Sequence, residues 1–177
     1  MKKAASIFLR ADIQHNDLAL LIRWLENPGI TRYMNEDPTA ARQLRQLSAS
    51  VPAPMLRFHL NRQGRFFLIC REDDRPIGFV KLTPLSGSGR YEIVYAVGEE
   101  SLWGRGYGES AIRKALSMAF LEWRAQDITA RIYAENQRSI RSVRSCGFRL
   151  RDTAGPLHRY TITSEDYLDD LRSQKRA

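Results

Sequence analysis

Three glycines alternate with larger residues in the stretch LWGRGYGESAI, residues 102–112, and this pattern suits the binding of an anion. Gly104, Gly106 and Gly108 cost backbone entropy, so the chain should gain something from them. A helical pattern follows at once, so backbone amides and the helix dipole would converge on one anionic group. A Walker loop is absent, and a dinucleotide loop would need glycine where Glu109 stands. A tight turn without a ligand remains the alternative.

Glu92 is the best candidate for acid–base chemistry, because it interrupts the otherwise apolar segment YEIVYAV, residues 91–97. A carboxylate in such a strand is costly unless it is hydrated or paired. Placed beside a substrate, it would accept the proton of an ammonium group, directly or through a water molecule. The alternative is that Arg90 and the strand end simply solvate it.

The net charge of +8 asks for an anionic partner, which could be nucleic acid, a phosphorylated ligand or a membrane surface. The arginines are spread along the chain. Arg138, Arg141 and Arg144 recur at helical spacing and form a basic ridge, which is either a solvated face or a contact for phosphate or an acidic substrate. No RNP-type aromatic motif or helix–turn–helix pattern accompanies the charge, so RNA binding has no further support.

The cysteines and histidines suggest neither a metal site nor a disulfide framework. Cys70 and Cys146 form no CxxC pair, and His15, His59 and His158 are scattered. No apolar run approaches the length of a membrane span, and the N-terminal apolar stretch is too short for a signal peptide. We therefore expect a cytoplasmic protein without a metal or a membrane contact.

The hydrophobic spacing predicts the elements that must position these residues. Helices are expected over 17–27, 39–50, 109–123 and 139–146, with a terminal helical turn at 164–174. Thr39 and Ser164 are candidate N-caps, Pro28 with Gly29 should end the first helix, Pro52 lies beyond the second, and Gly147 should stop the fourth. Strands are expected over 6–10, 65–71, 76–84, 91–97, 128–134, 148–152 and 158–163.

These elements predict one α/β domain over residues 1–177, in which a mixed α+β sheet carries helices on both faces. Hairpins come first and a strand–helix–strand unit follows. The strand at 91–97 is apolar on both faces and should be central. No repeat, low-complexity stretch or linker divides the chain.

Two motifs together make the chain resemble the GNAT superfamily of acyl-CoA N-acyltransferases. The family's main signature is Gln or Arg, two residues of any kind, then Gly-x-Gly or Gly-x-Ala, and its second half matches residues 103–108. The later block from Asn136 to Phe148 matches the family's Asn-x-x-Ser/Ala-Ile-Arg…Gly-Phe segment. The N-terminal elements and the final YTITSEDY resemble the subgroup of ribosomal-protein N-terminal acetyltransferases. The implied fold has a mostly antiparallel twisted sheet and a CoA cleft between two splayed central strands, 91–97 and 128–134.

The resemblance implies acetyl-CoA as the donor and assigns residues to it. Amides around the glycines would hold the pyrophosphate, and backbone groups near Ala96 and Val97 would pair with the pantetheine arm, one of them as an oxyanion donor. Asn136 would contact the arm. Arg141 belongs to the basic ridge, and it would contact the 3′-phosphate if that ridge is not simply a solvated face. The residues expected at the donor are Ala96, Val97, Trp103, Gly104, Arg105, Gly106, Tyr107, Gly108, Glu109, Asn136, Ser139 and Arg141. Glu92 would be the base, since the family often has glutamate there.

The sequence departs from the family pattern at two positions. Trp103 replaces the leading Gln or Arg, so one side-chain contact to CoA is lost. Val143 stands where many members have the tyrosine that protonates the leaving thiolate. Substitute acids are Ser142, Ser145, Cys146, Tyr107 and Tyr133, or none at all, because a thiol of pKa about 8.5 leaves readily near neutral pH.

The sequence does not specify the acceptor. The subgroup resemblance favours a protein or peptide amine that attacks directly in a ternary complex. Alternatives are a small amine such as an aminoglycoside or polyamine, a basic RNA-associated protein or aminoacyl-tRNA acetylating enzyme, and a CoA-binding domain without catalysis. The expected oligomeric state is a monomer or a homodimer.

Overall fold

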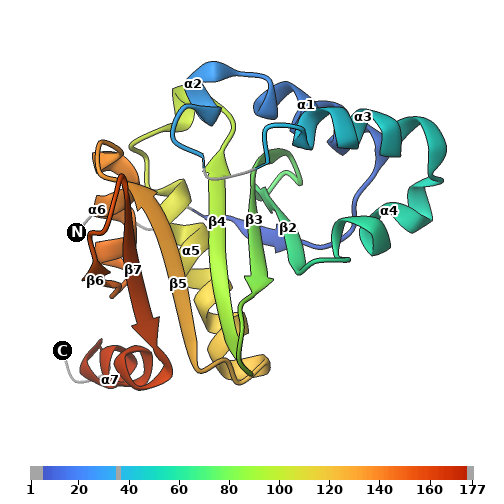
Figure 1. Cartoon of the computed structure of the whole chain (residues 1–177). Helices are drawn as coiled ribbons and strands as arrows, with labels where there is room; N and C mark the ends of the chain where they lie inside the picture. Colours follow the sequence, from blue (N-terminus) through green and yellow to red (C-terminus); the bar gives the residue numbers. More distant parts are fainter. Residues whose placement is uncertain (1–5, 35–36, 175–177) are drawn as a thin grey trace.

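The structure is a computed structural model that describes residues 6–34 and 37–174, and its strands form one sheet (Figure 1). Within these residues the strand order is β1-β2-β3-β4-β5-β7-β6. All neighbouring strands run antiparallel except β4 and β5, which are parallel. The strands are β1 Phe8–Arg10, β2 Arg65–Cys70, β3 Pro76–Pro84, β4 Arg90–Val97, β5 Asp127–Tyr133, β6 Arg149–Asp152 and β7 Leu157–Thr163. The expected mixed, mostly antiparallel sheet with β4 at its centre is confirmed.

Helices cover both faces of the sheet, as predicted. On one face α1, α2 and α4 bury residues such as Trp24, Ile30 and Leu56 against β2 and β3. On the other face α5 and α6 bury residues such as Leu116 and Val143 against β3, β4, β5 and β7 (Figure 1). The helices are α1 His15–Leu25, α2 Pro28–Thr31, α3 Ala40–Ser50, α4 Ala53–Leu60, the 3-10 helix η1 Glu100–Leu102, α5 Tyr107–Ser117, the π-helix η2 Met118–Glu122, α6 Gln137–Ser145 and α7 Ser164–Gln174.

Two prolines that were expected only to end helices also begin new ones. The first helix does end before Pro28, but Pro28 then opens the short helix α2, whose first turn is capped by Asn27 accepting the Gly29 N–H at 2.8 Å. Pro52 precedes α4, a helix that the sequence did not predict. Pro28 is the first residue of α2, where the N–H that proline lacks would be unbonded, whereas Pro52 is the N-cap of α4.

Two expected N-caps differ from those observed. Thr39 occupies the N-cap position of α3, but its hydroxyl donates to Asp37 at 2.7 Å and caps nothing. At α7 the capping residue is Thr163, not Ser164, because the Thr163 hydroxyl accepts the Asp166 N–H at 3.1 Å while Asp166 accepts the Thr163 N–H in return. This reciprocal cap explains why 164–174 is a full helix and more than the predicted single turn. Gly147 ends α6 with a left-handed φ of +91°, as predicted.

A close approach fixes helix α1 against the end of β4. A Cβ added at Gly98 would lie 2.2 Å from the ring of Trp24, which is itself 1% exposed. Only glycine lets the indole pack directly on the backbone at this point. The contact therefore holds α1 and α2 beside the end of the central strand.

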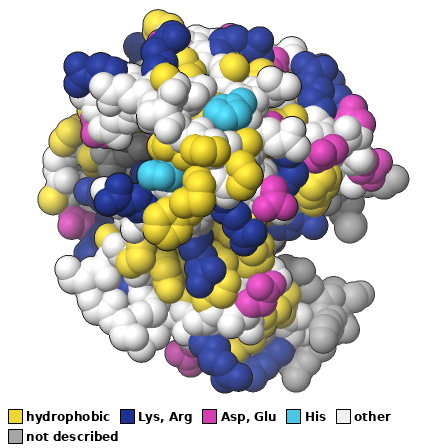
Figure 2. All heavy atoms as spheres, turned by 90° about the vertical axis from the view of Figure 1, so that its right-hand side faces the viewer, with side chains coloured by type: hydrophobic (Ala, Val, Ile, Leu, Met, Phe, Trp, Pro, Cys, Tyr) yellow, Lys and Arg dark blue, Asp and Glu magenta, His cyan; other side chains and the backbone are white. Residues whose placement is uncertain are grey.

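The surface over α3 and α4 carries hydrophobic side chains among basic ones (Figure 2). Met55 and Phe58 of α4 are 47% and 65% exposed. Among the described residues, no helix is long and apolar enough to cross a membrane.

Candidate donor and acceptor site

The central strands β4 and β5 separate half-way along their length. They pair at Arg90–Asp127, Tyr91–Ile128 and Glu92–Thr129 and no further, although β4 continues to Val97 and β5 to Tyr133. The splayed central strands expected from the sequence are therefore present, and the gap between them leaves two strand edges facing each other.

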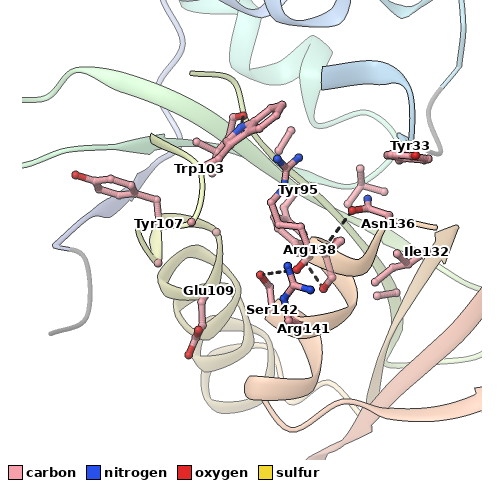
Figure 3. Close-up of a pocket in the computed structure, with 18 of the residues that line it drawn as sticks. Tyr33, Tyr95, Trp103, Tyr107, Glu109, Ile132, Asn136, Arg138, Arg141 and Ser142 are labelled. Carbon is pink, nitrogen blue, oxygen red and sulfur yellow. Dashed lines mark hydrogen bonds between the residues drawn. The ribbon is translucent and has the colours of Figure 1, made fainter. Parts of the chain in front are cut away.

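A cavity of about 1320 Å³ occupies this gap and extends over the first turns of α5 and α6 (Figure 3). Every residue expected at the donor lies in its wall. The wall also includes Ile30, Tyr33, Met34, Tyr95, Arg113, Ala130, Arg131, Ile132, Arg138, Ser142 and Ser145. Figure 3 shows Tyr107 and Glu109 of α5 on one side of the cavity, and Tyr33, which follows α2, with Ile132 of β5 on the other.

The glycine stretch forms an open cradle of amides at the start of α5. Gly104 and Gly106 have φ of +72° and +86°, and a Cβ added at either would meet nothing within 4 Å. Within the described chain, no hydrogen-bond partner is found for the amides of residues 104–109. Unpaired amides at a helix N-terminus attract an anion, and the free space above the glycines would let it approach closely.

Tyr95 of β4 stands between the first turns of α5 and α6. Its ring packs on Gly108, where an added Cβ would come within 3.2 Å, and its hydroxyl lies 2.8 Å from the Ser139 Oγ. Burial raises the pKa of Tyr95 to about 12, so the hydroxyl is neutral at physiological pH. Asn136 caps α6 by accepting the Ser139 N–H at 3.2 Å. The two helix N-termini are therefore held on the same side of the cavity.

Trp103 is anchored from both sides. Its Nε1 donates to the Val97 carbonyl at 2.8 Å, and the Arg138 guanidinium lies 3.6 Å from the centre of its ring. Burial lowers the pKa of Arg138, which nonetheless remains a cation. The indole thus makes a structural contact where the family usually has a polar side chain.

The end of β4 offers backbone groups to the cavity at alternate residues. The Gly98 N–H bonds the Ile77 carbonyl of β3 at 2.8 Å. Because hydrogen bonding alternates along an antiparallel strand, Ala96 also faces β3, whereas Val97 and Tyr95 direct their N–H and C=O toward the cavity. Of the two residues expected to offer backbone groups, Val97 is the one that points toward the gap.

Glu92 is 7% exposed and lies just beyond the cavity wall, in the last β4–β5 pair. Its partner is Arg131 of β5, not Arg90. Arg131 Nε donates to Oε1 at 2.8 Å and Nη2 to Oε2 at 2.7 Å, while Arg90 pairs with Asp127. The bond to Glu92 raises the pKa of Arg131, so the guanidinium stays charged. Arg131 itself lines the cavity and is 49% exposed.

The position of the family's usual acid is closed to the cavity. Val143 is fully buried and packs in the core under α6. Among the substitutes considered, Tyr107, Ser142 and Ser145 reach the cavity wall, whereas Tyr133 and Cys146 do not.

Sequence reasoning did not single out Tyr95, Arg113 or Arg131. Strand alternation could have found Tyr95, since it shares a face with Tyr91 and Ile93. Arg131 could have been found by asking which β5 residue lies beside Glu92, but the register between two parallel strands is set by tertiary packing. Arg113 bonds Glu109 at 3.0 Å and the Ser145 carbonyl, which ties α5 to α6.

Comparison with known families identifies the class. The model of the acetyltransferase (GNAT) domain matches residues 7–149. The chain is also 30% identical, over 134 residues, to the uncharacterized N-acetyltransferase p20 of Bacillus licheniformis; the match covers 75% of this chain and 73% of the relative. The chain belongs to the GNAT acetyltransferase family, and its acetyl donor is acetyl-CoA.

Solved structures share this fold. Spermidine N-acetyltransferase of Vibrio cholerae, in complex with CoA and spermine, is 20% identical with a TM-score of 0.75, covering 92% of this chain and 98% of its own. An aminoglycoside acetyltransferase in complex with coenzyme A and kanamycin is 19% identical with a TM-score of 0.75, covering 94% and 99%. In residues 6–34 and 37–174, no cluster of His, Cys, Asp and Glu could hold a metal ion.

Proposed function

We propose that this acetyltransferase moves the acetyl group of acetyl-CoA directly to a primary amine while both substrates are bound. The observation that carries the proposal is the alignment of the gap beyond Glu92–Thr129 with the unpaired amides of residues 104–109. The pyrophosphate would lie on these amides, and the pantetheine arm would run along β4 toward the strand fork, the point beyond Glu92–Thr129 where β4 and β5 separate. Asn136 and Ser139 would contact the arm, and Arg141 the 3′-phosphate.

Each step of the transfer has a residue beside the strand fork. Glu92 would take the proton of the incoming ammonium group, directly or through a water. The neutral amine would then attack the thioester carbon, and the Val97 N–H would stabilise the oxyanion. The carbon–sulfur bond breaks as the amide forms, and the thiolate leaves without a dedicated tyrosine, since Val143 is outside the cavity.

The acceptor that we propose first is the amine of a peptide or protein, which the motifs of the sequence suggested. The solved structures compared above are polyamine and aminoglycoside acetyltransferases and give the ribosomal-protein subgroup no support. A small-molecule amine is the second candidate, because solved relatives of the same fold are bound to spermine and kanamycin. Against a polycation stands the cavity wall, where Glu109 is the one carboxylate among the described lining residues and is paired with Arg113.

Steady-state kinetics with both substrates varied test the proposal. Direct transfer gives intersecting double-reciprocal lines, and Glu92→Gln should lower kcat on the order of 10²-fold or more while leaving the Kd of acetyl-CoA within about twofold. Parallel lines with an isolable acetyl-enzyme would overturn direct transfer. Full kcat/KM for Glu92→Gln at every pH would remove Glu92 as the base.

A further inference from the structure

Two arginines face the same side of the sheet next to the strand fork. Arg131 of β5 pairs with Arg159 of β7 in the antiparallel register, and both are exposed. Side chains at directly opposed positions have Cβ atoms about 4.5–5.5 Å apart, and like charges there are unfavourable. The helices that cover this face pack over β2 and β3 and leave β5 and β7 open (Figure 1).

The charges of the two arginines are only partly matched. Arg131 uses Nε and Nη2 on Glu92, and its Nη1 bonds nothing in the described chain. Arg159 makes no ion pair or hydrogen bond with any described side chain. Asp152 of β6 lies opposite Arg159, but its Oδ1 accepts the Ala154 N–H and it forms no ion pair with the arginine. The open face therefore presents one unpaired guanidinium and one free nitrogen.

The neighbouring cavity wall is aromatic and apolar. Ile30 of α2 lines it, together with Tyr33 and Met34, which follow this helix. The ring of Tyr33 lies 6.5 Å from that of Tyr133, which follows Arg131 by two residues on β5. A cationic acceptor would find no unpaired carboxylate in the described wall at this end. An acceptor with an apolar body and a negative group would find both partners.

We propose that the acceptor is a primary amine carrying a carboxylate close to the amine, as in a free α-amino acid or a peptide whose first residue is acidic. The carboxylate binds Arg159 and the Nη1 of Arg131, and the ammonium group faces Glu92. The negative Glu92 thus lies beside the ammonium group of the zwitterion, and the positive Arg131 beside its carboxylate. This inference rests on the proposed function and narrows its acceptor.

The reaction balances with the groups already named. The ammonium proton passes to Glu92, and the neutral amine then forms a bond to the acetyl carbon. As the thioester carbon–sulfur bond breaks, the second N–H proton of the adduct passes through solvent to the thiolate, and Glu92 afterwards returns its proton to solvent. The products are an N-acetylated acid and CoA, and removal of the cationic ammonium leaves an anion that Glu92 no longer attracts.

Three acceptors test the need for the carboxylate: phenylalanine, phenylalaninamide and phenethylamine. They share the same benzyl group and carry a carboxylate, a carboxamide or neither next to the amine. We expect kcat/KM to be at least about tenfold higher for the acid than for the amide or the amine, the worth of one charge-assisted contact. The carboxylate can belong to a free amino acid or to the acidic first residue of a peptide. A higher kcat/KM for a peptide that begins with Asp than for the same peptide beginning with Asn would indicate the peptide. Spermidine should be the poorest acceptor. Equal or higher kcat/KM for phenethylamine or spermidine overturns the inference but leaves the proposed function standing.

Arg159→Gln provides the matched variant. It should reduce the acid-to-amine preference by about tenfold without changing the KM of acetyl-CoA, and Arg159→Glu should reverse the preference. Arg62→Gln, at the α4–β2 connection, removes the same charge elsewhere and should keep the parent preference. An unchanged preference in Arg159→Gln overturns the inference. If no amine of any kind is acetylated by the folded, acetyl-CoA-binding protein, the proposed function itself fails.

Discussion

The guanidinium of Arg138 lies over the ring of Trp103, 3.6 Å from its centre, and joins the first turn of α6 to the loop that follows β4. The indole Nε1 is bonded to the Val97 carbonyl at the end of β4. One side chain therefore connects three elements of the cavity wall, and the cation stacks on the ring in a partly desolvated place.

Replacing Trp103 should loosen this wall. Trp103→Leu loses both contacts, and we expect acetyl-CoA to bind about 5- to 50-fold more weakly, which corresponds to about 1–2.3 kcal/mol. Trp103→Phe keeps an aromatic ring under Arg138, so acetyl-CoA affinity should fall only by the contribution of the Nε1 hydrogen bond. Calorimetric titration with acetyl-CoA measures both variants. Undiminished affinity in Trp103→Leu would show that the contact is irrelevant to the donor.

Gly106→Ala should impair donor binding more than stability. A left-handed φ costs a non-glycine residue roughly 1–2 kcal/mol, and the added methyl group would enter the open space above the cradle. Gly155→Ala is the matched control, because Gly155 has φ +74° and equally open surroundings but lies away from the cavity. We expect similar losses in the free energy of unfolding and a raised KM for acetyl-CoA in Gly106→Ala alone. A raised KM in both variants would indicate a general effect of strain.

Arg131→Leu should destabilise the fold by leaving Glu92 buried and unpaired. The loss of unfolding free energy should be about 1–3 kcal/mol, below the range for a fully buried pair because Arg131 is half exposed. Adding Glu92→Gln to this variant should restore part of the loss. Arg90→Leu, which breaks the more exposed pair with Asp127, should cost less. Strictly additive losses in the double variant would contradict coupling of Glu92 and Arg131.

Stability should fall at alkaline pH through Cys146. Burial raises the pKa of this thiol from 9.0 to about 12, so the unfolded chain ionises first. The stability is therefore complete below pH 9 and is lost as pH rises toward 12, at up to about 1.4 kcal/mol per pH unit. Cys146→Ala should flatten urea-unfolding stability between pH 9 and 10. Tyr95 adds a similar fall between its ordinary value of 10.0 and about 12, which Tyr95→Phe should remove. A slope unchanged in Cys146→Ala between pH 9 and 10 would refute this assignment.

The elements that carry strong periodicity could be read from the sequence. The amphipathic stripe of α1 and the β-branched runs of β3, β4 and β5 were placed within a few residues. The short helices α2 and α4 could not, because proline signals both the end of one helix and the first turn of another. Local sequence does not distinguish Thr163 from Ser164 as the cap of α7, because either hydroxyl can accept the N–H of a first helical turn.

In the candidate site, too, local features could be predicted from the sequence, whereas contacts between distant segments could not. The amide cradle depends on residues next to one another, so the spacing of the glycines was sufficient. The partner of Glu92 depends on the register of two strands joined through a helix, and local sequence does not specify that register. The packing of Tyr95 against Gly108 and Ser139 likewise joins three distant segments.

The three residue pairs that join β4 to β5 make the sheet two mechanical units. One unit is the four-stranded piece β1-β2-β3-β4 and the other is the three-stranded piece β5-β7-β6. The ion pairs Arg90–Asp127 and Glu92–Arg131 link the two pieces across this β4–β5 seam. An extended ligand with amides of its own, hydrogen-bonded to both inner edges, would act as an eighth strand and tie the halves together. Hydrogen exchange should therefore slow on both sides of the seam when the donor binds, including in β7, which the cavity does not touch.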